Sequence, residues 1–147
     1  MTGSRLAART PESAGRGLQG PTRGALARAV LAADGLGCAG AAAVVLGSKR
    51  VASAVDPTMT SRRQLAVALT ATSALLLAGA ARTRPTDGDL ERAALVNTGW
   101  VLLCAVGLSR RPPGLGAALI GCTAVLDGAA ALAHWQLRAA ASRTNTR

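Results

Sequence analysis

Four apolar stretches alternate with polar segments along this chain, and none of the stretches contains a lysine or an arginine. A charge at the centre of a helix in lipid costs about 2.5 to 3.5 kcal/mol, so the exclusion of all seventeen cations favours membrane spans. The sequence therefore predicts an all-α fold, a four-transmembrane-helix bundle over residues 25–140. The predicted spans are residues 29–47, 64–81, 93–108 and 114–137.

Polar tails flank this region. Residues 1–24 are rich in Arg, Gly, Ser, Thr and Pro and show no apolar period, so we predict a disordered basic N-terminal tail. A contact between this basic tail and lipid is the functional alternative. Residues 141–147 form a short polar C-terminal tail in this interpretation.

The composition narrows the class of protein further. Tyr and Phe are absent and Trp occurs twice, which argues against a large soluble core, because aromatic side chains usually dominate buried area. The net charge of +10 is spread between the spans and not gathered on one basic face, so we predict no nucleic-acid partner. The predicted partner is the lipid bilayer, with a second copy or another membrane protein as a further candidate. A soluble Ala-rich bundle is the rival fold.

The distribution of Lys and Arg predicts the orientation of the spans. With both termini in the cytoplasm, the inner segments carry eleven of these residues and the outer loops carry six. The excess on the inner side favours a multi-pass protein of the cell membrane with cytoplasmic termini.

Small residues recur at four-residue spacing in the first two spans, and such stripes let two helix backbones approach closely. They support a compact bundle without identifying which helices touch. The stripes are Ala33, Gly37 and Ala41 in the first span and Ala66, Thr70, Ala74 and Ala78 in the second.

Thiols apart, Asp34, Asp127 and His134 are the only ionisable groups inside the predicted spans. Counting about 1.5 Å per residue from the inner arginines places Asp34 roughly 9 Å deep, His134 roughly 6 Å and Asp127 roughly 16 Å. Asp127 and His134 are two turns apart on one face of the last span. They could form a proton or cation relay with Asp34 if the first and last spans pack together. In the alternative, Asp34 is hydrated near the membrane interface and His134 lies at that interface. Only the charge of Asp127 must then be neutralised, by protonation or by a partner on another helix.

A second polar stripe lies in the third span, where Asn97, Trp100 and Cys104 share one helical face. The simple interpretation is that Asn97 hydrogen-bonds a neighbouring helix while Trp100 fills the space beside it. The more specific interpretation is that the stripe lines a small pocket, with Trp100 as its wall. No catalytic or phosphate-binding motif and no metal-ligand spacing is present, so we predict no enzymatic activity, no cofactor and no metal.

Three strings resemble a group of uncharacterised small integral membrane proteins of actinobacteria: RAVLAADGLGCAG, LVNTGWVLLCAVGL and AHWQLRAA. This resemblance implies a four-helix membrane protein and brings no known activity. The chain is also similar in outline to small multidrug-resistance transporters, in which a membrane carboxylate lies in the first helix and a Trp in the third, as Asp34 and Trp100 do here. We therefore expect a structural or accessory membrane component. The alternative is a small proton-coupled transporter that uses Asp34 and Asp127.

Overall fold

The computed structural model describes residues 21–55 and 62–145, and within them the chain forms five helices and no strand. Four of these helices are long and apolar enough to cross a membrane, which confirms the all-α fold and its four spans. The helices are α1 (Pro21–Gly47), α2 (Lys49–Val55), α3 (Arg62–Ala80), α4 (Asp87–Ser109) and α5 (Gly114–Asn145).

The helices extend beyond most of the predicted spans. Helix α1 begins at Pro21, so the last four residues of the predicted tail are helical, while residues 1–20 lie outside the described part of the chain. Proline suits this first position because it has no N–H to leave unpaired. Helix α5 continues to Asn145, into the predicted C-terminal tail. Helix α2 is short and was not predicted, because it has no long apolar run.

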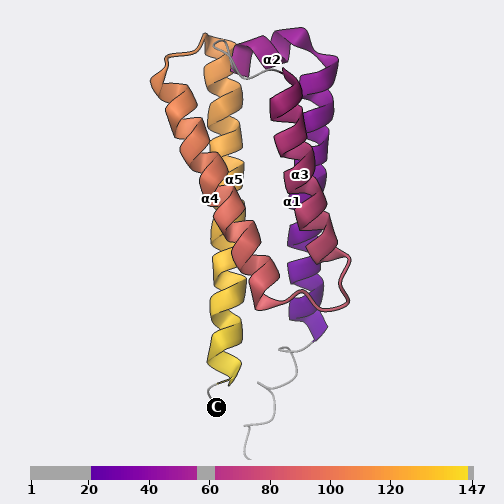
Figure 1. Cartoon of the computed structure of the whole chain (residues 1–147). Coiled ribbons are helices and arrows are strands. Elements are labelled where there is room, and N and C mark those ends of the chain that lie inside the picture. Colours follow the sequence, from indigo (N-terminus) through magenta and orange to yellow (C-terminus); the bar gives the residue numbers. More distant parts are fainter. Residues whose placement is uncertain (1–20, 56–61, 146–147) are drawn as a thin grey trace, which may run out of the picture.

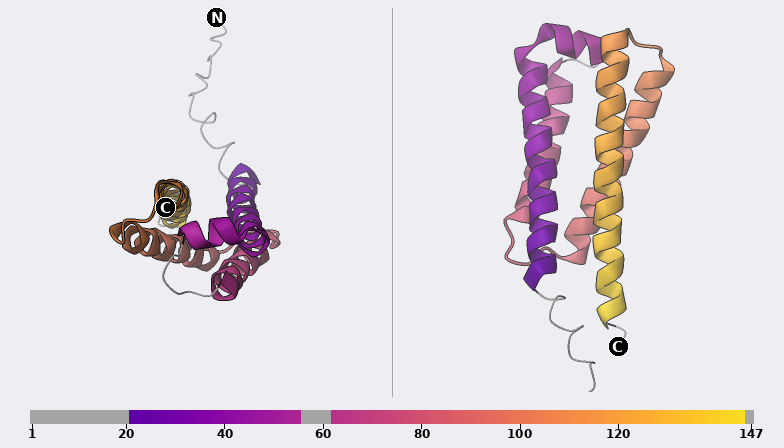
Figure 2. Two further views of the ribbon diagram at one scale, coloured as in Figure 1. Left: turned by 90° about the horizontal axis from the view of Figure 1, so that it is seen from above. Right: turned by 180° about the vertical axis from the view of Figure 1, so that it is seen from behind.

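The four long helices form two antiparallel hairpins (Figure 1). The N-terminal hairpin consists of α1 and α3, and the C-terminal hairpin consists of α4 and α5. Contacts within each hairpin are far more extensive than contacts between the two. Helix α2 lies across one end of the bundle and reaches from α1 towards α5 (Figure 2). The start of α1, the α3–α4 turn and the end of α5 lie together at the opposite end.

Close packing holds the N-terminal hairpin together. Gly35 of α1 lies against Leu76 and Leu77 of α3, so close that an added Cβ would be 2.9 Å from Leu77 Cγ. The core around this contact includes Leu31 and Leu76, each 1 % exposed. Burial of these two leucines therefore accompanies a close approach of the backbones.

Most residues of the small-residue stripes do not lie on the packing faces of the helices. Ala33, Gly37 and Ala41 are exposed on the outside of α1, and of the α3 stripe only Ala66 is buried. The buried positions of α1 instead follow a neighbouring row, which comprises Ala27, Leu31, Gly35, Cys38, Ala42 and Val45. In helices this rich in alanine, four-residue spacing occurs on several faces at once, so it does not select the one that packs.

Local signals in the sequence end and restart the helices. Thr86 caps α4 by accepting a hydrogen bond from the backbone N–H of Asp89, whose carboxylate in turn accepts one from the backbone N–H of Thr86. Arg82 also pairs with Asp89, at 3.2 Å. At the other end of α4, Arg111 adopts a left-handed conformation with φ 53°, and two prolines then lead into α5. A left-handed residue followed by proline is a common way to stop a helix.

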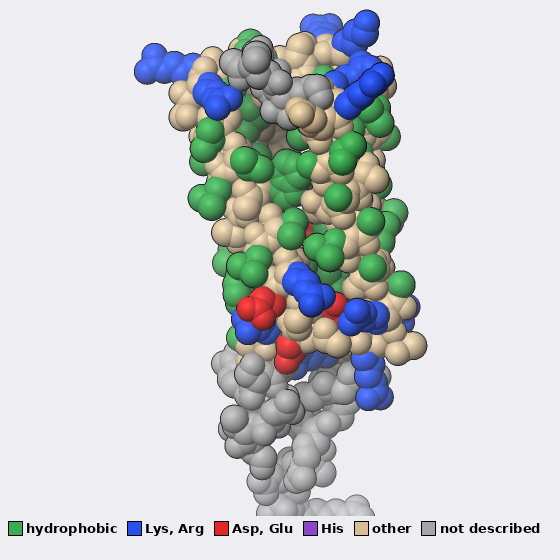
Figure 3. Space-filling view, in the orientation of Figure 1, with side chains coloured by type: hydrophobic (Ala, Val, Ile, Leu, Met, Phe, Trp, Pro, Cys, Tyr) green, Lys and Arg blue, Asp and Glu red, His purple; other side chains and the backbone are tan. Residues whose placement is uncertain are grey.

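The surface of the bundle has the polarity of a membrane protein. Large apolar side chains cover its length, as in the case of Val125, which is 71 % exposed. Lys and Arg gather at the two ends, and acidic side chains are visible at the end that carries the α3–α4 turn (Figure 3). Because an apolar belt between two charged ends matches the layers of a bilayer, the chain is a membrane-embedded protein.

The arrangement of the helices predicts the result of a topology experiment. Reporter fusions after Arg50 and after Arg111 should report the same side of the membrane, because both residues lie at the end crossed by α2. Fusions after Arg84 and at the C-terminus should report the other side. A paired alkaline phosphatase and fluorescent protein reporter measures this directly. If two fusions at consecutive points along the sequence reported the same side of the membrane, the four-span topology would be contradicted.

Candidate intramembrane polar site

Three polar side chains from three helices meet inside the bundle. The Oδ2 atom of Asp34 on α1 accepts a hydrogen bond from Asn97 Nδ2 on α4 at 2.6 Å. The same oxygen lies 3.2 Å from His134 Nε2 on α5. Asn97 and His134 are completely buried, and the side chain of Asp34 is 10 % exposed. We call these three residues the polar cluster.

The hydrogen-bonding capacity of the polar cluster is only partly used. Asn97 Oδ1 and His134 Nδ1 are buried and have no hydrogen-bond partner among the described residues. With Asp34 ionised, Oδ2 accepts from both neighbours, so a neutral His134 carries its proton on Nε2 and leaves Nδ1 as a bare acceptor. An ionised Asp34 is therefore well held, while His134 and Asn97 each keep one unpaired acceptor.

Helix packing fixes the position of the polar cluster. Asp34 directly precedes Gly35, the residue at which α1 packs closely against α3. Asn97 follows Ala93 and Ala94, which are 1 % and 0 % exposed, so this face of α4 points into the bundle. His134 lies at a buried position of α5. Asp34 is thus held by one hairpin, and both of its partners are held by the other.

Polar contacts also join the two hairpins elsewhere. Trp100 Nε1 on α4 donates to Thr72 Oγ1 on α3 at 3.3 Å. At the end of the bundle, the Arg23 guanidinium donates to the carbonyl of Leu137 on α5. Since contacts between the hairpins are otherwise sparse, these hydrogen bonds and the polar cluster form much of the connection between them.

Asp127 does not join the polar cluster directly. It lies on α5, two turns from His134, and makes no hydrogen bond or ion pair with the described residues. Because it shares a face of α5 with the buried His134 and is itself partly buried, it faces the same interior region. The sequence placed Asp34 at a depth between Asp127 and His134. In the structure Asp34 lies beside His134, and His134 is buried among the helices.

The three residues of the predicted polar stripe on α4 lie in two different environments. Asn97 belongs to the polar cluster and Cys104 is buried near Asp127, whereas Trp100 lines an open groove on the outside. Thr72, the partner of Trp100, was not singled out from the sequence, because a lone threonine in an apolar helix usually bonds its own backbone. Its position opposite Trp100 depends on how the hairpins pack.

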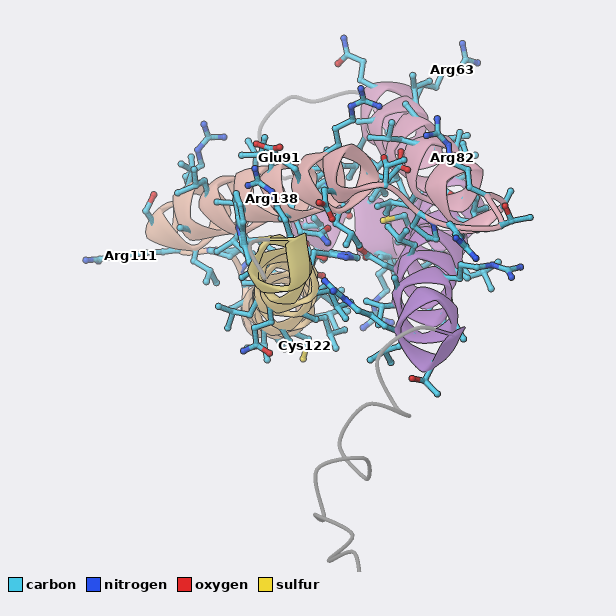
Figure 4. The ribbon with its side chains drawn as sticks, turned by 90° about the horizontal axis from the view of Figure 1, so that it is seen from below. Arg63, Arg82, Glu91, Arg111, Cys122 and Arg138 are labelled. Atoms are coloured by element: carbon cyan, nitrogen blue, oxygen red, sulfur yellow. The ribbon has the colours of Figure 1, made fainter. Side chains whose placement is uncertain are left out.

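In the described part of the chain, the other polar contacts are scattered over the bundle. Within residues 21–55 and 62–145, no group of three His, Cys, Asp or Glu side chains is placed to hold a metal ion. Cys122 is exposed on the outer face of α5 (Figure 4). Arg138 pairs with Glu91 at 3.2 Å near the end of the bundle, and its guanidinium lies over the ring of Trp135. The polar cluster is therefore the best-defined candidate site.

Comparisons of the chain with protein-family models, curated proteins and solved structures find no match.

Proposed function

We propose that this membrane protein binds and releases a proton at the polar cluster and works as a small, non-enzymatic, proton-coupled transporter. The observation that carries the proposal is the contact between Asp34 and His134, two titratable side chains from different hairpins that lie buried between apolar helices. Ionisable groups inside membrane helices are costly and usually mark a path for ions or protons.

A proton would change the bonding between the hairpins. In the ionised state, Asp34 accepts charge-assisted hydrogen bonds from Asn97 and His134, and such bonds are about twice as strong as neutral ones. A proton taken up from water by the carboxylate converts it to a neutral acid and weakens both bonds. The hairpins, which share few other contacts, would then be freer to move apart.

The other titratable groups facing this region are Asp127 on α5 and the thiols of Cys38 and Cys104. Asp127 is the natural next proton carrier, because it lies further into the bundle and has no hydrogen-bond partner among the described residues. In this proposal the proton passes between the polar cluster and Asp127, along the face of α5 that carries His134 and Asp127.

A second candidate function is a structural or accessory role in which the polar cluster is a permanent clamp. The observation that favours it is that one carboxylate oxygen meets two donors at once, so the charge of Asp34 is already balanced by hydrogen bonds. In this role the partners are the bilayer, a second copy of the chain or another membrane protein.

Proton binding can be measured without knowing a substrate. Proteoliposomes on a solid-supported membrane should give a transient charging current when the solution is jumped from about pH 8 to about pH 5. Asp34→Asn should remove most of this current, while Asp87→Asn, a change at an exposed acid, should keep it. Equal amounts of each variant are confirmed by immunoblot. An unchanged current in Asp34→Asn would exclude the transporter and favour the clamp.

We further propose the cell membrane as the location, with both termini in the cytoplasm, on the strength of the Lys and Arg distribution. Membership of the actinobacterial membrane-protein group is also a proposal. Its support is that Asp34, Asn97 and His134 each lie in one of the three strings that carry the resemblance.

A further inference from the structure

The polar cluster holds a buried negative charge next to two neutral donors. The donors are the amide of Asn97 and, while its ring carries one proton, the imidazole of His134. A net charge enclosed among apolar helices is costly, and the cost falls when a charge of opposite sign lies beside it. The ionised cluster therefore favours the uptake of one proton.

The other titratable groups around His134 add no positive charge to this interior. Asp127 shares its face of α5, and the thiols of Cys38 and Cys104 are buried on α1 and α4. Helix α3 has no ionisable side chain beyond its first two arginines. Among the described residues, no lysine or arginine pairs with Asp34. The arginines near this end of the bundle bind other groups: Arg23 the carbonyl of Leu137, Arg28 that of Ala80, Arg82 the carboxylate of Asp89 and Arg138 that of Glu91.

His134 Nδ1 is the atom of the cluster that can accept this proton. It is buried and accepts no hydrogen bond from a described residue, so its lone pair is unused. A proton on Nδ1 makes the ring an imidazolium, while Nε2–H keeps its contact with Asp34 Oδ2 at 3.2 Å. The net charge of the cluster then becomes zero. Free imidazole is also a stronger base than a free carboxylate, with ordinary pKa values of about 6.5 and about 3.9. The ring should therefore be protonated before the carboxylate.

An unused atom of Asn97 suits the proton-bound form. The amide nitrogen of Asn97 must face Asp34, because an ionised carboxylate can only accept hydrogen bonds. This orientation leaves Asn97 Oδ1 buried and without a partner among the described residues. Asn97 and His134 contact the same carboxylate oxygen, so their unused atoms belong to one small cluster. One proton on Nδ1 changes this set from two unpaired acceptors to one donor and one acceptor.

We propose that His134 binds the first proton at Nδ1 and that the resulting ion pair with Asp34 holds the two hairpins together. This inference rests on the proposed proton-binding function and adds the order in which the groups are protonated. The proton comes from a hydronium ion in water and forms one new bond, Nδ1–H, with the lone pair of the ring. Asp34 lies on α1 and His134 on α5, so the pair joins hairpins that share few other contacts. A second proton, on Asp34, removes the attraction and releases them.

Nitrogen NMR can read the protonation state of His134 directly, because the chain contains one histidine. The protein is labelled at its histidine, purified through a tag that contains no histidine, and reconstituted in liposomes. In a neutral ring the two nitrogens resonate far apart, and in an imidazolium they resonate close together. We expect a neutral ring protonated at Nε2 at about pH 8 and mainly imidazolium at about pH 6.

Asp34→Asn tests the ion pair, because it removes the charge of the carboxylate and keeps the shape of the side chain. The ratio of imidazolium to neutral ring at about pH 6 should fall about tenfold or more, since an adjacent carboxylate favours the charged ring by at least that factor. Asp87→Asn, a change at an exposed acid, should leave the ratio unchanged.

His134→Gln tests the order of protonation. The glutamine amide can still donate to Asp34 but does not bind a proton in this pH range. The charging current for a jump from about pH 8 to about pH 6 should therefore be lost. A jump to about pH 4 should still give a current, because the carboxylates can be protonated there.

Two outcomes would overturn the inference. A ring that stays neutral from about pH 8 to about pH 5 would place the first proton on Asp34, and a charging current would then still support the proposed function. An equal ratio of imidazolium to neutral ring in the wild type and in Asp34→Asn would show that the ring titrates without its partner. Failure of the proposed function looks different: the wild type would form the imidazolium but give no charging current.

Discussion

Replacing Asp34 with alanine should destabilise the folded bundle by about 2–4 kcal/mol, because it removes two hydrogen bonds and leaves both partners buried and unpaired. Asn97 and His134 are completely enclosed, so water cannot readily replace the lost carboxylate. Asp34→Asn should cost less, since an amide oxygen can still accept one of the two bonds. Thermal unfolding in detergent, followed by far-UV circular dichroism, measures the difference.

Asp127→Ala is the matched control for this prediction. It removes the other interior carboxylate, which has no hydrogen bond to a described residue, so stability should change by less than about 1 kcal/mol or should rise. Equal losses in Asp34→Ala and Asp127→Ala would contradict a specific role for the contacts of Asp34. They would indicate that any change in this region disturbs the bundle.

The four spans could be predicted because a charged side chain is costly at the centre of a helix in lipid. Arg28, Arg92 and Arg138 bound long runs that carry no cation, and the helices cover those runs. The interior polar residues could also be recognised, because Asp34, Asn97 and His134 interrupt otherwise apolar segments. A polar side chain in a membrane helix normally faces the protein, and all three do.

The way the helices pack could not be predicted by the same means. Lipid chains are as apolar as leucine, so small residues such as Ala33 and Gly37 are as compatible with lipid as with a helix partner. The partner of Asp34 depended on the rotation and depth of three helices at once. A small error in depth exchanges His134 for Asp127. Helix α2 was missed because seven residues carry little periodic signal.

The largest packing effect is expected at Gly116, in the first turn of α5. A Cβ added here would lie 2.0 Å from the carbonyl oxygen of Ala54 on α2 and 3.0 Å from its carbonyl carbon. Both are backbone atoms, so a rotamer change cannot relieve the overlap. Gly116→Ala should therefore push α2 away from α5 and destabilise the protein by up to about 3 kcal/mol, the upper range for overpacking.

Gly114, two residues earlier on the same helix, provides the control, because a Cβ added there would meet no atom within 4 Å. Gly114→Ala should leave stability unchanged or raise it slightly, since alanine favours the helix by up to about 1 kcal/mol. Trypsin offers a local measurement, because Lys49 and Arg50 begin α2 and become easier to cleave when α2 is displaced. Faster cleavage in Gly116→Ala than in Gly114→Ala is the expected result. Identical cleavage rates and unfolding temperatures would show that α2 does not depend on this close approach.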